Sequence, residues 1–170
     1  MGGLAGSTII VVVRLFVAVW PPAPVVDALG ELSRPIDRDV RWTTPEQWHV
    51  TLRFLGSVED VSGVRSALRD VSWSPSQVDV GPATTRLGPS VLVLPVRGLD
   101  ALARALPFEL EEPYVGHLTL ARARRGRIPS SLTGVPFEAS WIASSFSLVR
   151  STTKPSGAVY DDVEAYEAIS

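Results

Sequence analysis

Residues 48–56 read Trp-His-Val-Thr-Leu-Arg-Phe-Leu-Gly and contain His49, one of only two histidines in the 170-residue chain. The other, His117, opens the stretch His-Leu-Thr-Leu at residues 117–120, so both histidines begin the pattern His-x-Thr-Leu. The chain holds 10 Thr and 18 Leu, so chance would place both residue types behind both histidines with a probability on the order of a few in 10⁵. This repeat is the strongest indication of a functional site in the sequence.

Both copies of the pattern predict β-strands. Side chains on a strand alternate between two faces, so His49, Thr51 and Arg53 are expected on one face, opposite the apolar residues 50, 52 and 54. His117 and Thr119 are expected to share a face in the same way. Each copy would then hold an imidazole and a hydroxyl about 7 Å apart above an apolar backing. Two such strands lying side by side would bring four polar groups to one cleft.

These side chains together suit a phosphodiester. The unperturbed pKa of imidazole lies near neutrality, so one histidine can take a proton from an attacking water while the other gives a proton to the departing oxygen. Thr51 and Thr119 can donate hydrogen bonds to non-bridging oxygens, and Arg53 can neutralise charge in the transition state. No metal is required, and two histidines without an acidic cluster make a poor zinc site, because catalytic zinc usually takes three protein ligands.

The overall composition narrows the class of protein. Hydrophobic residues make up 45% and charged residues 20% of the chain, which is ordinary for a globular protein. A net charge of −2 and a pI near 5.7 argue against a protein that coats long nucleic acid, but they allow a small anionic substrate that is gripped locally. The absence of cysteine excludes disulfides, thiolate catalysis and cysteine-based metal sites.

The first 20 residues are expected to contain a leader and a buried strand. Residues 1–12 are expected to be a leader or extension that continues into the first strand, and residues 13–170 are expected to form a single domain of two lobes. Arg14 interrupts the apolar stretch over residues 8–20 and Pro21 ends it, so the stretch falls short of the roughly 20 residues of a membrane-spanning helix. A signal peptide would need a positive segment first, and residues 1–8 contain no Lys or Arg.

The rest of the pattern predicts many short strands and few helices. Helices are expected after Pro22, after Asp60 and after Asp100, with the two aspartates as N-caps. This order favours the α+β class over a parallel doubly wound fold. Strands are expected over residues 11–20, 41–55, 78–80, 91–96, 114–123, 137–149 and 159–168.

Residues 48–56 and 117–122 resemble the two signatures of the 2H phosphoesterase superfamily, and within it the bacterial RNA 2′,3′-cyclic phosphodiesterases, also called 2′-5′ RNA ligases. Residues 14–19 resemble the opening strand of that family, and residues 157–160 resemble its C-terminal segment. Gly116 departs from the family, which commonly has proline before the second histidine. The resemblance implies an α+β fold with two pseudo-symmetric lobes of antiparallel sheet plus helices, flanking a central cleft.

The same resemblance implies metal-independent hydrolysis of an RNA or nucleoside 2′,3′-cyclic phosphate to a 2′-phosphate. It makes His49 the proton donor and His117 the proton acceptor, with Thr51, Thr119 and Arg122 on the substrate. Strict alternation puts Arg122 opposite His117, so its role requires a twist or bulge in the strand. Ligation of RNA through a 2′-5′ linkage would be the same chemistry run backwards.

Two alternatives stay open at this point. The substrate could be another cyclic phosphate or a 2′-5′-linked oligonucleotide, or the cleft could belong to a non-catalytic module that binds RNA ends. In each case we expect a cytoplasmic monomer without a cofactor, a membrane attachment or an obligate protein partner. Arg122, Arg124, Arg125 and Arg127 form a basic run that is expected to be a solvated strand end and loop, as most charge runs are, with a collar for RNA phosphates beside the cleft as the alternative. Four aromatic side chains are candidates for stacking a base: Phe16, Trp42, Trp48 and Tyr160.

Overall fold

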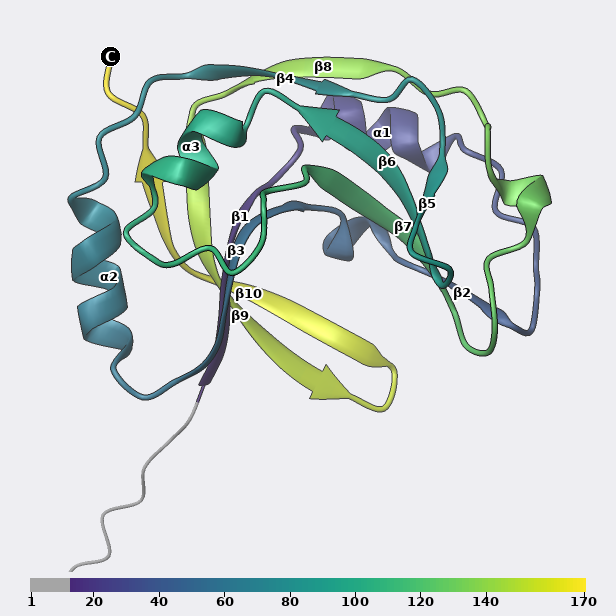
Figure 1. The fold of residues 1–170 in the computed structure, drawn as a ribbon, viewed down its shortest axis with the longest axis horizontal. Helices are drawn as coiled ribbons and strands as arrows, with labels where there is room; N and C mark the ends of the chain where they lie inside the picture. The colour runs from purple at the N-terminus through teal and green to yellow at the C-terminus, as the bar shows by residue number, and fades with distance from the viewer. Residues whose placement is uncertain (1–12) are drawn as a thin grey trace, which may run out of the picture.

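The two motif strands meet at the middle of a long sheet (Figure 1). In this computed structural model, which describes residues 13–170, strand β3 (Val50–Val58) pairs with strand β7 (His117–Ala123) through Val50 and Leu118. The strand order β10-β9-β1-β3-β7-β6-β4-β8 places four strands on each side of this junction, so the two motifs occupy equivalent places in two halves. Every strand pair formed within residues 13–170 is antiparallel, in agreement with the predicted α+β class.

The first half contains the strand expected near the N-terminus. β1 (Val13–Val19) lies between β3 and β9 (Ser145–Lys154), and β10 (Gly157–Glu167) completes this half. The buried residues of β1 alternate between two clusters: Leu15, Val17 and Val19 enter the main core, while Phe16 and Ala18 pack on the other face. The apolar stretch is therefore a central strand with both faces covered, as its composition predicts. The leader expected over residues 1–12 lies outside the described residues.

The second half is built on β6 (Val91–Arg97), which pairs with β7 and with β4 (Ser76–Val80). β8 (Ala139–Ala143) pairs with β4 and forms the outer edge. Two short strands extend this half: β2 (Val40–Trp42) pairs with β7, and β5 (Thr85–Leu87) pairs with β6. The sequence did not predict β5, because three residues are too short for an alternating pattern to stand out. The continuous sheet supports the proposal that residues 13–170 form one domain.

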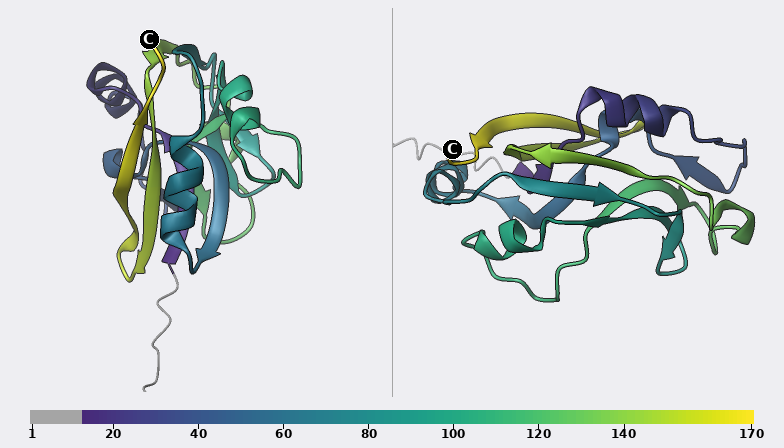
Figure 2. Two further views of the ribbon diagram at one scale, coloured as in Figure 1. Left: turned by 90° about the vertical axis from the view of Figure 1, so that its left-hand side faces the viewer. Right: turned by 90° about the horizontal axis from the view of Figure 1, so that it is seen from above.

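Three short α-helices cover the sheet: α1 (Ala23–Gly30), α2 (Val61–Arg69) and α3 (Asp100–Ala105). Seen from above, α1 and α3 lie on opposite sides of the strands (Figure 2).

Asp60 caps α2 as predicted, since its carboxylate accepts the backbone N–H of Gly63 at 2.9 Å. The predicted cap at Asp100 is wrong, because Leu99 holds the N-cap position and Asp100 lies in the first turn, where an acidic side chain suits the helix dipole. Two 3₁₀ turns complete the fold: Pro45–Gln47 and Ser130–Leu132.

Both motif strands bulge at the same position of the motif. In β3, the neighbouring residues Val17 and Ala18 of β1 pair with Arg53 and Thr51, which leaves Leu52 without an opposite residue. In β7, adjacent residues of β6 pair with residues 121 and 119, which leaves Leu120 unpaired. A bulge interrupts the alternation of side chains, so the residues after it change face.

None of the helices within residues 13–170 has the length and apolar character to span a bilayer.

Candidate active site

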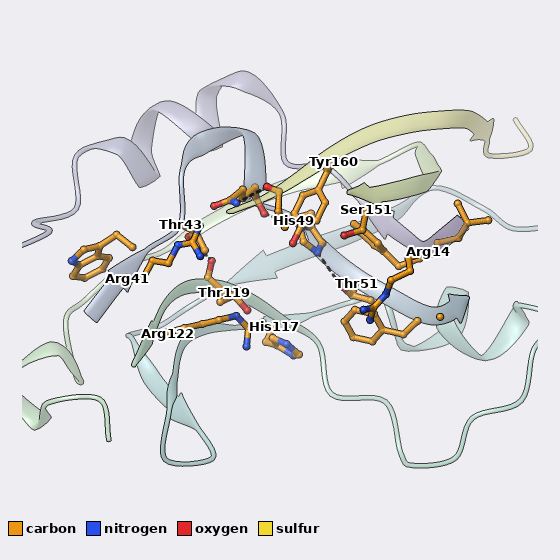
Figure 3. Close-up of a pocket in the computed structure, with 17 residues that line it drawn as sticks. Arg14, Arg41, Thr43, His49, Thr51, His117, Thr119, Arg122, Ser151 and Tyr160 are labelled. Atoms are coloured by element: carbon orange, nitrogen blue, oxygen red, sulfur yellow. Dashed lines mark hydrogen bonds between the residues drawn. The ribbon is translucent and has the colours of Figure 1, made fainter. Parts of the chain in front are cut away.

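The two motifs open onto one cavity of about 420 Å³ between the halves of the sheet. His49 and Thr51 enter it from β3 and the residue before it, and His117 and Thr119 enter from β7 (Figure 3). The predicted convergence of two imidazoles and two hydroxyls is therefore present. The other residues that line the cavity are Arg14, Leu15, Phe16, Arg41, Trp42, Thr43, Gln47, Phe54, Gly56, Arg122, Ser151, Ala158 and Tyr160.

Both imidazoles are held by the same backbone contact. Nδ1 of His49 lies 2.7 Å from the carbonyl oxygen of Gln47, and Nδ1 of His117 lies 2.8 Å from that of Val115, in each case two residues earlier in the chain. A carbonyl oxygen can only accept a hydrogen bond, so Nδ1 carries a hydrogen in both rings. Nε2 of each histidine is then the nitrogen that can take or give a proton. For His49, the hydroxyl of Thr51 lies 3.0 Å from Nε2.

His49 lies among aromatic rings. The centroid of its ring is 4.9 Å from that of Phe16, 5.6 Å from that of Trp20 and 5.2 Å from that of Tyr160. Burial among these rings is the main reason that the pKa of His49 is lowered to about 4; the hydrogen bond to the Gln47 carbonyl opposes the shift, and the electrostatic effects of His117 and Arg122 contribute to it. His49 is therefore neutral at pH 7 when the cavity is empty of anions. A bound anion would raise this pKa.

Close packing on β6 holds His117 in place. The preceding residue, Gly116, accepts the backbone N–H of Val96 at 2.9 Å. A Cβ at Gly116 would lie 2.3 Å from the carbonyl oxygen of Val96, so a side chain at this position would push the two strands apart. The absence of a side chain at Gly116 therefore lets β7 lie close to β6 immediately before the histidine.

Thr43 holds the bulge of β7. Its hydroxyl lies 2.9 Å from the carbonyl oxygen of Thr119 and 2.8 Å from that of Leu120, and its backbone N–H donates to the Leu120 carbonyl at 2.9 Å. The same hydroxyl accepts the indole N–H of Trp48 at 3.0 Å. Trp48 is only 1% exposed and does not line the cavity, so its predicted candidacy for stacking a base is wrong. Its role is to anchor Thr43 from the core.

The bulges correct two expectations about which residues face the cleft. Arg53, expected beside His49 and Thr51, is 6% exposed and does not line this cavity. Its guanidinium instead donates to the carbonyl oxygens of Ala103, Phe108 and Glu109. Phe54, expected in the apolar backing, lines the cavity and is 71% exposed. Strict alternation fails here because the bulge at Leu52 turns the rest of the strand over.

The same effect brings Arg122 into the cavity. The bulge at Leu120 places Arg122 on the same side of the strand as His117 and Thr119. This is the bulge that the predicted phosphate-binding role of Arg122 requires. Of the rest of the basic run, Arg124, Arg125 and Arg127 are exposed and line neither this cavity nor a second one beside it, in agreement with a solvated segment.

Arg14 and Arg41 also line the cavity, although the sequence pattern did not predict either of them as a site residue. Arg14 comes from β1, where a charged residue interrupting an apolar strand was the available signal. Arg41 pairs in register with Arg122 and donates to the Ser156 carbonyl at 2.7 Å. No aspartate or glutamate is among the residues of the described chain that line this cavity, which favours an anionic ligand. Residues 13–170 also hold no group of three or more His, Asp or Glu side chains arranged to bind a metal ion.

Residues 19–85 match the family described as LigT like Phosphoesterase, a stretch that contains the first motif and ends before the second. A protein named RNA 2′,3′-cyclic phosphodiesterase from Archaeoglobus fulgidus is 27% identical over 180 residues, which cover 91% of this chain and 99% of that protein. The chain is thus similar to LigT-like phosphoesterases over these residues, and to this phosphodiesterase over most of its length. The predicted resemblance is thereby confirmed.

Solved structures share the fold of this chain. TT0787 of Thermus thermophilus superposes with a TM-score of 0.75 and 28% identity, over 91% of this chain and 97% of that one. Escherichia coli LigT, solved in complex with 3′-AMP, superposes with a TM-score of 0.78 at 21% identity, over 94% of this chain and 100% of that one, and shows the shared fold.

Proposed function

We propose that this protein hydrolyses the 2′,3′-cyclic phosphate of an RNA end or a nucleoside to a 2′-phosphate, using His49 and His117 as an acid/base pair and no metal ion. One observation carries the proposal. Two imidazoles with the same Nδ1 contact expose Nε2 to a single cavity lined by three arginines and, within the described chain, by no carboxylate. The relative named RNA 2′,3′-cyclic phosphodiesterase supports the same activity.

The reaction follows from the two Nε2 atoms. Nε2 of His117 takes a proton from a water molecule, whose oxygen attacks the phosphorus. The bond between phosphorus and the 3′ oxygen breaks, and Nε2–H of His49 gives its proton to that oxygen, which leaves the phosphate on the 2′ oxygen. Both nitrogens return to their starting states through exchange with solvent. General acid and base steps of this kind each contribute roughly 10²- to 10⁴-fold to the rate.

The hydroxyls and Arg122 bind the phosphate. Thr51 and Thr119 would donate to the non-bridging oxygens, and Arg122 would neutralise the charge that grows on them in the transition state. Arg53 takes no part in substrate binding, because its guanidinium is occupied by carbonyl oxygens outside this cavity.

The low pKa of His49 fits the donor role only when substrate is bound. With its pKa lowered to about 4, His49 holds no proton at pH 7 in the free protein. A cyclic phosphate bears a negative charge, which favours the protonated imidazole and raises the pKa of His49. Substrate and proton would therefore bind together, and His49 would carry the proton when the 3′ oxygen departs.

The same site would support 2′-5′ ligation if a ribose 5′-hydroxyl took the place of water at the phosphorus. We propose that the protein acts as a monomer, without a cofactor or an obligate protein partner. The other candidates are a different cyclic phosphate or a 2′-5′-linked oligonucleotide as substrate, and a module that binds RNA ends without turnover.

The test is incubation of the purified protein with adenosine 2′,3′-cyclic phosphate in EDTA, with chromatographic separation of adenosine 2′- and 3′-phosphate. Formation of the 2′-phosphate would support the proposal. Binding without turnover would favour the RNA-end module, and turnover confined to other cyclic phosphates or to 2′-5′-linked oligonucleotides would favour the second substrate class. Formation of the 3′-phosphate would contradict the direction of bond cleavage.

A further inference from the structure

Arg14, Ser151 and Tyr160 form a row across three neighbouring strands. Arg14 of β1 lies opposite Ser151 of β9 in the sheet register, and Ser151 lies opposite Tyr160 of β10. All three side chains line the central cavity (Figure 3). The row therefore presents a guanidinium and two hydroxyls, all of which are hydrogen-bond donors, to the same space. The reaction proposed above uses none of them.

The row lies on the other side of the histidines from Arg122. β3 and β7 are antiparallel and pair near their beginnings, so they run in opposite directions away from the two histidines. Arg14 lies opposite Ser57 near the end of β3, whereas Arg122 lies near the end of β7. Figure 3 shows the result, with the two histidines between Arg14 and Arg122.

The positive charge of the cavity exceeds what one cyclic phosphate can offset. Arg14, Arg41 and Arg122 line the cavity, and the ion pairs formed within residues 13–170 involve other arginines. Residues 1–12 contain no aspartate or glutamate that could compensate them. A cyclic phosphate is a diester with a single negative charge, and in the proposed reaction it lies beside Arg122. Arg14 therefore remains for a second anion, since a cleft lined by one sign of charge attracts ions of the other.

From this arrangement we infer that the row binds a phosphate on the 5′ oxygen of the nucleoside that carries the cyclic phosphate. The inference rests on the proposed function and specifies its substrate. In an RNA end, this group is the phosphodiester that joins the last nucleotide to the rest of the chain, and in a free nucleotide it is a 5′-phosphate. Arg14 supplies the charge, and the hydroxyls of Ser151 and Tyr160 donate to the non-bridging oxygens.

The position of the row fits such a phosphate. The 5′ oxygen lies across the ribose from the 2′ and 3′ oxygens, so the second phosphate lies one sugar away from the cyclic phosphate. The ring centroid of Tyr160 is 5.2 Å from that of His49, and the centroid of Phe16 is 4.9 Å from it. Arg14 is two residues before Phe16, which is about 7 Å further along β1. The row thus begins beside His49 and extends away from it.

Two side chains hold the β9–β10 hairpin, which carries two members of the row. Arg41 donates to the Ser156 carbonyl at 2.7 Å, and Nε2 of Gln47 donates to the Ala158 carbonyl at 2.8 Å. The backbone carbonyl of Gln47 is also the one that holds His49. The same residue therefore fixes the hairpin and the proposed proton donor relative to each other. A site formed before substrate binds reduces the entropic cost of binding.

The experiment compares kcat/KM for three substrates with the same reacting group. They are adenosine 2′,3′-cyclic phosphate, the same nucleoside with an added 5′-phosphate, and the dinucleotide ApA ending in a 2′,3′-cyclic phosphate. In the wild type, each of the two substrates with a phosphate on the 5′ oxygen should exceed the first by about tenfold or more, as charge-assisted hydrogen bonds predict.

Variants of the row should reduce this ratio. Arg14→Gln should bring it close to one, and Ser151→Ala and Tyr160→Phe should each lower it by less. Arg150→Gln is the matched control, because Arg150 precedes Ser151 on β9, is exposed and lines neither cavity. This variant should leave the ratio unchanged. A ratio between substrates is independent of the fraction of each variant that is folded.

Three outcomes would overturn the inference while leaving the proposed function in place. Equal kcat/KM for the three substrates in the wild type would show that no phosphate on the 5′ oxygen is recognised. A gain for the dinucleotide alone would attribute it to the added nucleoside. A ratio unchanged in Arg14→Gln, Ser151→Ala and Tyr160→Phe would place the second phosphate elsewhere. Absence of turnover of all three substrates would overturn the proposed function, and the inference with it.

Discussion

Phe54 and Arg122 occupy equivalent positions in the two halves, each five residues after the motif histidine, and both line the central cavity. Both face it because β3 bulges at Leu52 and β7 at Leu120. The duplicated strands thus place an aromatic ring at one position and a guanidinium at the other. This difference makes the two sides of a pseudo-symmetric site chemically distinct.

Arg122→Ala should reduce kcat/KM for a 2′,3′-cyclic nucleotide by about 10²- to 10³-fold, because it removes a donor to the oxygens on which transition-state charge develops. Arg124→Ala is the matched control, since Arg124 is exposed and lines neither cavity. Steady-state kinetics of both variants test the prediction. An equal loss in the two variants would attribute the effect to overall charge.

Arg53→Met should destabilise the fold more than it impairs the chemistry. The substitution leaves the buried carbonyl oxygen of Ala103 without its donor, at a cost of about 1–3 kcal/mol, and removes the part-buried hydrogen bonds to Phe108 and Glu109, which solvent can partly replace. Urea unfolding should show a free energy of unfolding lower by about 2–4 kcal/mol. A loss of activity with an unchanged free energy of unfolding would instead indicate that Arg53 binds the substrate.

His49 should make the stability depend on pH. Its pKa is about 4 in the folded protein, against 6.5 for an unperturbed imidazole, so between these values the unfolded chain binds a proton that the folded chain does not. The free energy of unfolding should therefore fall as the pH falls from about 6.5 to about 4, by about 3 kcal/mol in full. Urea unfolding across this range measures it. His49→Gln should lack this part of the dependence, and an identical pH dependence in variant and wild type would contradict the assignment.

A bound anion should shift the same equilibrium. NMR titration of His49 should give a midpoint near 4 in the free protein, chiefly because the imidazole is buried. Adenosine 2′-phosphate should move that midpoint upward, because its negative phosphate favours the protonated imidazole. A midpoint that stays in place at saturating nucleotide would contradict the proposed coupling of substrate and proton binding.

The sequence predicted the central strands, the antiparallel α+β class and the convergence of both histidines and both threonines. These features follow from the alternation of apolar and polar residues and from the duplicated His-x-Thr-Leu pattern, and both can be read directly from the linear sequence. The positions of Arg53, Phe54 and Arg122 depend on bulges, which arise from pairing with β1 and β6 and leave no local signal. Arg41 and Ser156 meet across the fold for the same reason, since contacts between distant segments are set by tertiary structure.

The central claim is that His49 and His117 act as donor and acceptor on one phosphate. A cyclic nucleotide with sulfur in place of the 3′ bridging oxygen tests this directly, because a thiolate departs without needing a proton. His49→Ala should hydrolyse that substrate at a rate close to the wild type, while His117→Ala should remain slower by about 10²-fold or more, as loss of a general base predicts. Rescue of His117→Ala instead, or of neither variant, would contradict the account.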